Sequence, residues 1–456
     1  MLIPWKNKDN TIDEFEQVKQ LLSNGENIFI TGGGGVGKSY LLGKLQEHYK
    51  KLLTLTSTTG ISAINIGGQT LHSWAGIGLG EKPVDDVVKK INRKPTLKKQ
   101  LQSCRMLAID EISMLDDYTM EYVDEVLQQI RENSKPFGGI QIILVGDFFQ
   151  LPPVKMSDRE SGRDFCFNSK TWKNLNLTII LLKKVKRQSE QEFINALNNV
   201  RIDKTSNEDL KVFYDRDYPS TYEPDKNILQ IFGTNKDADA YNEKCFNELD
   251  TRPYKFSSKD LMFEYSVFED GDATNTIKLT DETIEKLSFT DKKCLENFNR
   301  DCKAPKELEL KEGCRVMLLK NIDLKKGLVN GSCGTIKTLT TASIDVLFDN
   351  GQRLNLDPIE FDYNQDGKTK IKRIQYPLRL AYGITIHKSQ GMTFDKLVVN
   401  FNKIFAYGQG YVALSRTRSL NGLIIKGFDH NKIVANHKVV EFYKNLEQST
   451  KSLIFE

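Results

Sequence analysis

Short apolar runs alternate with longer stretches of helical character along the first part of the chain. A short apolar run bounded by turn residues is typical of a buried strand. Regular alternation of such strands with helices is typical of a parallel α/β sheet. The pattern therefore predicts an α/β domain in this region. Its predicted strands are residues 27–31, 52–56, 106–109, 141–145 and 178–182.

The alternation continues to about residue 250, with a predicted helix at 190–200 and a predicted strand at 227–232. Residues 251–310 are polar and predict irregular structure. From Leu310 to about Ile374, short alternating strands such as 315–319 and 343–348 predict a small β-barrel. Turns are predicted between these strands at Asn330-Gly331, Cys333-Gly334 and Asn350-Gly351.

Apolar strands at residues 396–400 and 422–426 mark the return of the α/β pattern. A chain of 456 residues is too long for one ordinary core. The predicted fold class is therefore α/β, with two parallel-sheet domains and a small β-barrel inserted in the second. The first domain is predicted at 1–180 with a small insertion near 75–100, the second at 181–250 and 375–456, and the inserted module at 251–374.

Composition points to a soluble globular protein, with 39% hydrophobic and 28% charged residues. No apolar run is long enough to span a bilayer, and the start, MLIPWKNKDN, lacks the apolar core of a signal peptide. We expect an intracellular protein without a membrane partner, cytoplasmic in a bacterium or virus and nuclear or mitochondrial in a eukaryote. The seven cysteines form no C-x-x-C pair, which favours reduced thiols over zinc or disulfides. The net charge of +4 is small, so nucleic-acid binding would need a local groove of Lys and Arg.

The segment TGGGGVGKSY joins a predicted strand to a predicted helix and has the spacing Gly32-x4-Gly37-Lys38-Ser39 of a P-loop. Glycines let backbone N–H groups surround phosphate oxygens, and the helix dipole points at the same place. Lys38 is predicted to reach the β- and γ-phosphates of a bound nucleotide, and the Ser39 hydroxyl to bind Mg²⁺. A flexible glycine linker is the alternative, but it does not explain the flanking strand and helix. The predicted ATP-binding residues are Gly32, Gly33, Gly34, Gly35, Val36, Gly37, Lys38, Ser39 and Tyr40.

A second apolar strand ends in Asp110-Glu111, about 70 residues after the P-loop. Asp110 is predicted to hold Mg²⁺ through water, and Glu111 to orient and deprotonate the attacking water. A strand that simply meets a solvated turn is the alternative for this segment taken alone. The preceding P-loop favours the catalytic interpretation.

Three further polar residues are candidates for contact with the γ-phosphate. Gln150 follows the strand in GDFFQLPPV, where two prolines fix the turn, and is predicted to sense the γ-phosphate. Arg187 and Arg416 are predicted arginine fingers that would stabilise the transferred phosphate from the second domain. A solvated surface charge is the alternative for either arginine alone.

A dense donor cluster follows an apolar run in the segment YPLRLAYGITIHKSQGMT. It contains His387, Lys388, Ser389, Gln390 and Thr393, beside Gly391. A lone histidine is more often structural, but so many donors within seven positions indicate a turn that faces phosphates.

In chain order, the segments GGGGVGKS, TTGISAINIGGQTLHSWAGIG, LAIDEISML, GDFFQLPPV, KRQ, LRLAYGITIHKSQGMTFDKLVV and GQGYVALSRTRSLNGL resemble the motifs of Pif-type DNA helicases. These are superfamily 1B motors related to RecD-like proteins and to phage Dda. The resemblance runs from about Asn27 to Phe442, and residues 251–306 carry little of it. It implies two RecA-like domains with ATP between them, a Src-homology-type barrel in the second, and functions in DNA replication, repair and recombination.

The resemblance also implies a track for single-stranded DNA across both domains, with Trp74 as a residue that stacks on a base. A core position is the alternative for Trp74. Gln17 is the nearest candidate for the adenine-reading glutamine of the family, because Phe15 lies where that glutamine is expected, and Gly391 is assigned to ATP binding. The residues implied for the DNA track are Thr58, Thr59, Gly60, His72, Trp74, His387, Lys388 and Ser389.

The activity implied is ATP-driven 5′-to-3′ unwinding by a protein that is monomeric when free, with single-stranded and forked or tailed duplex DNA as partners. The alternative is an ATP-gated scaffold that binds single strands without unwinding. A nuclease is disfavoured because the sequence offers no further carboxylate cluster or metal-ligand pattern.

Overall fold

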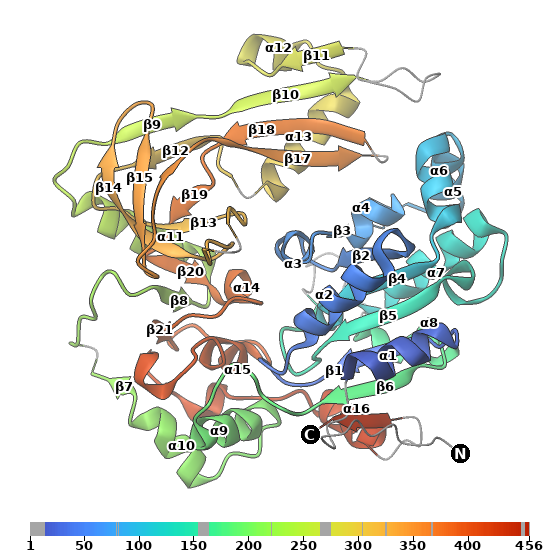
Figure 1. Ribbon diagram of the computed structural model, residues 1–456, viewed down its shortest axis with the longest axis horizontal. Helices are drawn as coiled ribbons and strands as arrows, with labels where there is room; N and C mark the ends of the chain where they lie inside the picture. The colour runs from blue at the N-terminus through green and yellow to red at the C-terminus, as the bar shows by residue number, and fades with distance from the viewer. Residues whose placement is uncertain are drawn as a thin grey trace. The chain divides into compact units, whose positions relative to one another are not determined.

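The computed structural model describes residues 14–78, 80, 82–153, 164–219, 221–264, 275–302, 304–323, 326–365, 368–447 and 452–455. The chain folds into two compact units, which Figure 1 colours by residue number. The first comprises residues 1–223, 231–233 and 385–456, and the second comprises residues 224–230 and 234–384. The main part of the inserted unit therefore begins at 234 and ends at 384, compared with the expected 251 and 374.

The first lobe of the first unit is a parallel sheet of seven strands in the order β23-β6-β1-β5-β4-β2-β3. Successive residues of β1 point to opposite faces, and both faces are apolar: Phe29 belongs to one core, and Ile28 and Ile30 to another. The apolar runs predicted five of these strands. Their bounds are β1 Ile28–Thr31, β2 Leu53–Ser57, β3 Gln69–Thr70, β4 Met106–Asp110, β5 Gln141–Gly146, β6 Thr178–Leu182 and β23 Ser452–Phe455.

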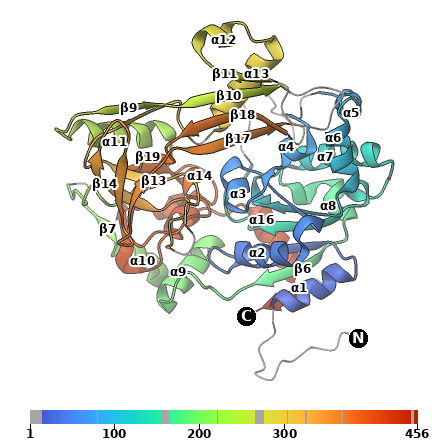
Figure 2. The same ribbon diagram turned by 45° about the horizontal axis from the view of Figure 1, so that its top comes forward.

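Helices pack around this sheet (Figure 2). Their apolar residues are buried in two cores. On one side lie α1 (Glu14–Ser23) and α2 (Lys38–Tyr49). The other core takes residues from α4, α5, α6, α7, α8 and α16. The predicted insertion near 75–100 corresponds to α5 and α6. The remaining bounds are α3 Gly60–Asn65, α4 Leu71–Ala75, α5 Val84–Asn92, α6 Pro95–Ser103, α7 Asp117–Arg131, α8 Lys170–Asn174 and α16 His437–Glu447.

The last part of the chain packs on the first lobe, although the sequence predicted residues 375–456 in the second domain. Strand β23 pairs in parallel with β6, with Leu453 opposite Ile180. Helix α16 places Val439 and Tyr443 in the core that contains Phe29. The prediction that residues 375–456 belong to the second domain is therefore wrong for the residues from α16 onward.

The second lobe contains a five-stranded sheet in the order β20-β8-β21-β22-β7. Strands β21 and β22 pair in parallel, with Val399 opposite Ile425, as the two apolar runs predicted. The strand bounds are β7 Asp217–Tyr218, β8 Gln230–Phe232, β20 Gly383–Thr385, β21 Leu397–Asn400 and β22 Leu423–Lys426. The helices are α9 Gln191–Arg201, α10 Asn207–Tyr214, α14 Ile386–Ser389 and α15 Gln409–Leu414.

The second unit contains antiparallel sheets, in agreement with the predicted β-rich insertion. One has the order β16-β15-β14-β13-β19, another β11-β10-β18-β17, and β12 pairs with β9. Its strands are β9 Tyr254–Ser257, β10 Lys259–Glu264, β11 Asn275–Lys278, β12 Glu307–Leu310, β13 Arg315–Leu318, β14 Cys333–Leu339, β15 Ile344–Phe348, β16 Arg353–Leu356, β17 Ile359–Gln365, β18 Lys368–Gln375 and β19 Leu378–Leu380. Its helices are α11 Asn235–Asn247, α12 Asp281–Glu285 and α13 Phe289–Asp301.

Two local predictions for this unit are wrong. The segment predicted as irregular, 251–310, supplies strands and helices, because alternate residues such as Met262 and Leu308 are apolar enough to be buried. Cys333-Gly334 begins β14 and is no turn. The two Asn-Gly turns are confirmed, with φ of 94° at Gly331 and 82° at Gly351, where glycine has no Cβ penalty.

Within the described parts of the chain, no helix combines the length and apolar character needed to cross a membrane. None of the seven cysteines, which all lie in the described part of the chain, forms a disulfide.

Candidate functional site

The P-loop runs from the end of β1 to Lys38, the first residue of α2. Its backbone takes left-handed values at Gly35 and Gly37, with φ of 83° and 98°. A Cβ added to Gly32 would lie 2.1 Å from the Leu182 carbonyl oxygen, so the loop passes too close to β6 for any side chain there. The glycines are therefore required by the loop conformation itself.

Lys38 points its ammonium group back into this loop. Its Nζ donates to the carbonyl oxygens of Gly32 at 2.7 Å and Gly33 at 2.9 Å. Burial lowers the pKa of Lys38, while Asp147, Glu111 and, more weakly, Asp110 oppose that shift. The lysine is thus held beside the loop, close to acidic groups.

Asp110 and Glu111, at the end of β4, form a carboxylate pair. Asp110 accepts hydrogen bonds from the Glu111 amide at 2.9 Å and from Ser62 Oγ at 3.2 Å. Glu111 has a left-handed φ of 53°, which is unusual for a residue with a side chain. Burial, together with the neighbouring Asp110 charge, raises the pKa of Glu111 to about 7. A carboxyl group with that pKa is suited to accept a proton near neutral pH.

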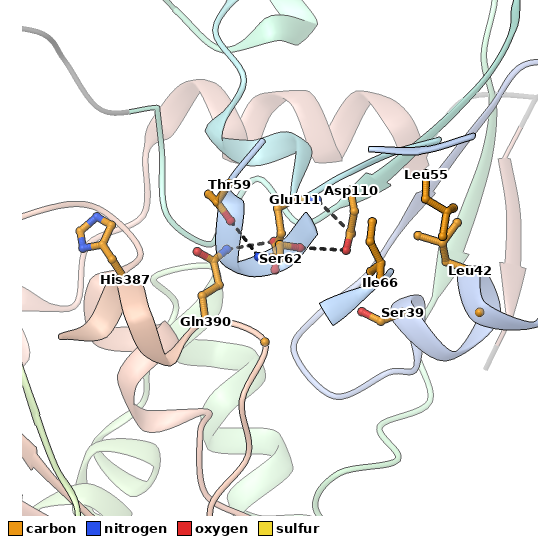
Figure 3. A pocket seen from close by; sticks show the side chains of 12 residues that line it. Ser39, Leu42, Leu55, Thr59, Ser62, Ile66, Asp110, Glu111, His387 and Gln390 are labelled. Atoms are coloured by element: carbon orange, nitrogen blue, oxygen red, sulfur yellow. Dashed lines mark hydrogen bonds between the residues drawn. The ribbon is translucent and has the colours of Figure 1, made fainter. Parts of the chain in front are cut away.

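A cavity of about 220 Å³ lies against this pair (Figure 3). Ser39 and Asp110 both line it, and a hydroxyl with a carboxylate suits Mg²⁺, which keeps few protein ligands and takes others from phosphates and water. Among the described residues, no cluster of three or more His, Cys, Asp or Glu could form a protein-only metal cage. The cavity is lined by Ser39, Leu42, Gly43, Leu55, Thr59, Ser62, Ile66, Asp110, Glu111, His387, Gln390 and Gly391.

The two predicted arginine fingers lie together beside the P-loop. Arg187 Nη1 donates to the Ser415 carbonyl at 2.9 Å, and Arg416 Nη2 donates to Ser415 Oγ at 2.8 Å. Arg187 Nη1 is 3.6 Å from where a Cβ on Gly34 would lie. Burial, reinforced by repulsion from Arg187, lowers the pKa of Arg416 to about 9. Two guanidinium groups held this close repel each other, and an anion bound between them would relieve that repulsion.

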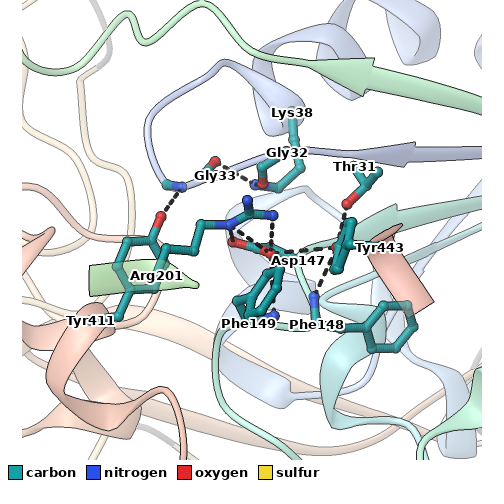
Figure 4. A network of polar contacts seen from close by, with 11 residues as sticks. Thr31, Gly32, Gly33, Lys38, Asp147, Phe148, Phe149, Arg201, Tyr411 and Tyr443 are labelled. Carbon is teal, nitrogen blue, oxygen red and sulfur yellow. Dashed lines mark hydrogen bonds and ion pairs between the residues drawn. The ribbon is translucent and has the colours of Figure 1, made fainter. Parts of the chain in front are cut away.

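A network that the sequence interpretation missed surrounds the other side of the loop (Figure 4). Arg201, the last residue of α9, forms a bidentate ion pair with buried Asp147, with contacts of 2.8 to 3.2 Å. Burial alone would raise the pKa of Asp147, but Arg201 holds it below its ordinary value. The guanidinium lies over Phe149, at 4.6 Å from the ring centre, and over Tyr443 at 5.1 Å.

Two tyrosines complete this network. Tyr443 from α16 hydrogen-bonds Thr31 Oγ1 at 2.6 Å and accepts from the Phe148 amide at 3.2 Å. Tyr411 from α15 accepts a hydrogen bond from the Gly34 amide at 2.6 Å. Asp147 and Tyr411 lie in motifs that the sequence singled out, whereas an arginine ending an amphipathic helix carries no signal that separates it from a surface charge.

Gln150 is buried and lies where the two lobes touch. Its backbone approaches Gly408, where an added Cβ would lie 2.4 Å from the Gln150 carbonyl oxygen. Within the described part of the chain, no contact of the Gln150 side chain identifies a sensor, so that role stays a prediction. Among the other ATP-binding candidates, Val36 is buried in the core next to α1 and α2, and Gly391 lines the cavity. Tyr40 is exposed, with the Lys44 ammonium group over its ring. Gln17 is half-buried on α1.

The DNA-track candidates divide into accessible and buried residues. Thr58, Thr59, Gly60 and His72 keep exposed surface, as do His387 and Lys388. Trp74 has none and packs with Leu71 and other residues of the core, so the stacking prediction for Trp74 is wrong and the core alternative holds. Ser389 is also fully buried and donates to the Ile386 carbonyl at 2.7 Å, so its predicted DNA contact is wrong.

A P-loop, a carboxylate pair, one arginine from a second parallel-sheet lobe and one from the segment that leads to it define a P-loop NTPase with two RecA-like lobes. Family models describe residues 7–211 as PIF1-like helicase and residues 293–339 as the 2B domain of DNA helicase Pif1. The chain belongs to the Pif1-like DNA helicase family.

The chain is 32% identical to the ATP-dependent DNA helicase Pif1 of Bdellovibrio bacteriovorus, over 94% of this chain and 90% of that protein. A crystal structure of Pif1 helicase from Candida albicans matches with a TM-score of 0.76 and 33% identity, covering 98% of this chain and 100% of that one. The Bacteroides Pif1 helicase in complex with ADP-AlF3 and ssDNA matches with a TM-score of 0.65 and 28% identity, over 99% of both chains. The chain spans 56 to 66% of the length of the eukaryotic relatives it matches.

Proposed function

We propose that the chain is an ATP-driven DNA helicase that moves 5′ to 3′ on single-stranded DNA and unwinds forked or tailed duplexes. The observation that carries this proposal is that Arg416 of the second lobe, together with Arg187 of the segment that joins the lobes, lies at the nucleotide site of the first lobe. Hydrolysis at such a site depends on contact between the lobes, which is what a motor needs to convert chemistry into movement.

Each residue near the phosphates has a distinct part in this proposal. The amides of the P-loop and Lys38 bind the β- and γ-phosphates. Glu111 takes a proton from the attacking water. Arg187 and Arg416 stabilise the charge that moves with the phosphate, and Gln150 detects whether the γ-phosphate is present.

Ser39 and Asp110 would hold Mg²⁺, which neutralises phosphate charge when bound. Gln17 and Gly391 are the remaining residues assigned to ATP. The proposal thus assigns the nucleotide to the face of the first lobe that meets the second.

The single strand is assigned to the accessible donors Thr58, Thr59, Gly60, His72, His387 and Lys388. Hydroxyl, amide and cationic groups bind phosphates without reading sequence. The names of the Bdellovibrio and Bacteroides proteins, and the ssDNA in the latter's structure, support this substrate. The polarity rests on the resemblance to superfamily 1B, and we further propose that the free protein is monomeric.

The proposal is tested by measuring phosphate release with and without single-stranded DNA, and unwinding of partial duplexes with a 5′ or a 3′ tail. Strong stimulation by DNA and unwinding from the 5′ tail are expected. Unwinding only from the 3′ tail would reverse the polarity. DNA binding without stimulated hydrolysis and without unwinding would identify an ATP-gated scaffold instead.

A further inference from the structure

Each member of the carboxylate pair is bound by one side chain from a segment that also carries DNA-track candidates. Ser62 Oγ donates to Asp110 Oδ2 at 3.2 Å, and Gln390 Nε2 donates to Glu111 Oε2 at 2.9 Å (Figure 3). Ser62 comes from the first lobe and Gln390 from the second. Both side chains line the cavity between the lobes, so neither contact serves only to fill a core.

Ser62 is tied directly to the candidates on the first lobe. It lies in the first turn of α3, which begins at Gly60, and its amide donates to Thr59 Oγ1 at 3.2 Å. The neighbouring Thr58 donates from its hydroxyl to the Glu111 carbonyl at 2.8 Å. Movement of this turn toward a phosphate would therefore move the groups that hold the carboxylate pair.

Gln390 has the same relation to the candidates on the second lobe. It directly follows α14, which carries His387 and Lys388 and is capped by Thr385, whose hydroxyl accepts from the Lys388 amide at 3.3 Å. Gln390 is 7% exposed, so its amide has little access to water as an alternative partner. A shift of this short helix would be transmitted to the Glu111 carboxylate.

We propose that Ser62 and Gln390 are positioning residues that couple occupancy of the DNA track to hydrolysis, by setting the orientation of Asp110 and Glu111. This inference rests on the proposed helicase function. In this arrangement, the Gln390 amide occupies a lone pair of the Glu111 carboxylate that could otherwise accept the proton of the attacking water. Binding of a strand to α3 and α14 moves both donors and frees the base.

The test compares Ser62→Ala and Gln390→Ala with the wild type in phosphate release, without DNA and with saturating oligothymidylate. Turnover without DNA is expected to rise in Gln390→Ala, and the ratio of stimulated to unstimulated turnover to fall at least about fivefold in both variants. Affinities for ATP and for oligothymidylate should change less than about twofold. Ser62→Thr, which keeps the hydroxyl, should retain the coupling, whereas Gln390→Asn, which is too short to reach Glu111, should not.

Rescue by a conservative variant separates positioning from a general structural defect, because Ser62→Thr keeps the hydroxyl that binds Asp110 and Ser62→Ala does not. Ser103→Ala and Gln191→Ala, exposed positions on α6 and α9, serve as matched controls.

An unchanged stimulation ratio in both variants, with the wild type stimulated, would overturn the coupling and leave the helicase proposal intact. A wild type that DNA does not stimulate would instead contradict the proposed function itself. Full coupling in Gln390→Asn, whose amide is too short to reach Glu111, would also contradict the assigned contact.

Discussion

The hydroxyl oxygen of Tyr411 lies 2.6 Å from the Gly34 amide nitrogen and accepts its hydrogen bond. A residue of the second lobe thus occupies an amide that a P-loop normally offers to a phosphate oxygen. Lys38 is engaged in a similar way, with its ammonium group on the carbonyl oxygens of Gly32 and Gly33. Groups of the protein itself therefore satisfy both the Gly34 amide and the Lys38 ammonium group.

Replacing Tyr411 with Phe should therefore tighten ATP binding. A net hydrogen bond contributes about 0.5–1.5 kcal/mol, so we expect the dissociation constant to fall by roughly two- to tenfold when ATP no longer displaces the hydroxyl. Equilibrium titration with a fluorescent ATP analogue measures this, with the exposed Tyr407→Phe as control. Weaker binding would mean that the hydroxyl also contacts the nucleotide.

Lys38→Ala and Glu111→Gln should separate phosphate binding from chemistry. The first removes the only side-chain charge placed in the P-loop and should abolish hydrolysis. The second keeps shape but removes the base, so ATP affinity should persist while turnover stops. Nucleotide titration and phosphate release check both, and normal turnover in Glu111→Gln would exclude Glu111 as the base.

The rate of hydrolysis should depend on pH near neutrality. Because the pKa of Glu111 is raised to about 7, the carboxyl is protonated and inactive below that pH and becomes ionised above it. Turnover should therefore rise with pH through about 7 and level off. Turnover measured as a function of pH with saturating ATP and DNA checks this rise. A midpoint near 4.5, the ordinary pKa of a glutamate, would contradict the buried environment of Glu111.

Arg187→Ala and Arg416→Ala should each reduce turnover by at least about tenfold, with a smaller effect on DNA affinity. Replacement by Lys should restore little activity, because the planar guanidinium makes paired contacts that an ammonium group does not. Single-turnover hydrolysis and oligonucleotide titration distinguish the two effects. A defect mainly in DNA affinity would assign these arginines to the DNA groove.

The buried pair of Arg201 and Asp147 should stabilise the fold. Arg201→Met leaves a fully buried carboxylate unpaired, which typically costs about 3–5 kcal/mol. Urea unfolding should show this loss, and the double variant with Asp147→Leu should recover part of it. Arg353→Ala, which removes an exposed ion pair with Asp345, should change the unfolding midpoint little.

The motifs located the P-loop and the carboxylate pair because their spacing along the chain reflects local geometry. Trp74 was predicted to stack on DNA but is buried. Leu71, Trp74 and Ala75 recur at helical spacing and form one buried face of α4, and this spacing in the sequence indicates a core position. The helical spacing correctly indicated a core position for Trp74, whereas the resemblance to the helicase motif implied a DNA contact.

Partners that are distant in the chain could not be predicted. The short run of β23 indicates a strand, yet no local feature says that it joins β6, some 270 residues earlier, and not the nearer sheet of β21 and β22. The partner of Arg201 could not be predicted either, because its ion pair with Asp147 forms only when α9 packs against the first lobe.

Gly408 has a mechanical consequence for the catalytic cycle. A single added methyl group there would overlap the carbonyl oxygens of both Phe149 and Gln150, so the two lobes meet backbone against backbone at this point. Such a contact yields far less than one between flexible side chains. In the proposed helicase, this contact would limit how far the two lobes can close, and the limit would be set by the peptide backbone and not by a side chain.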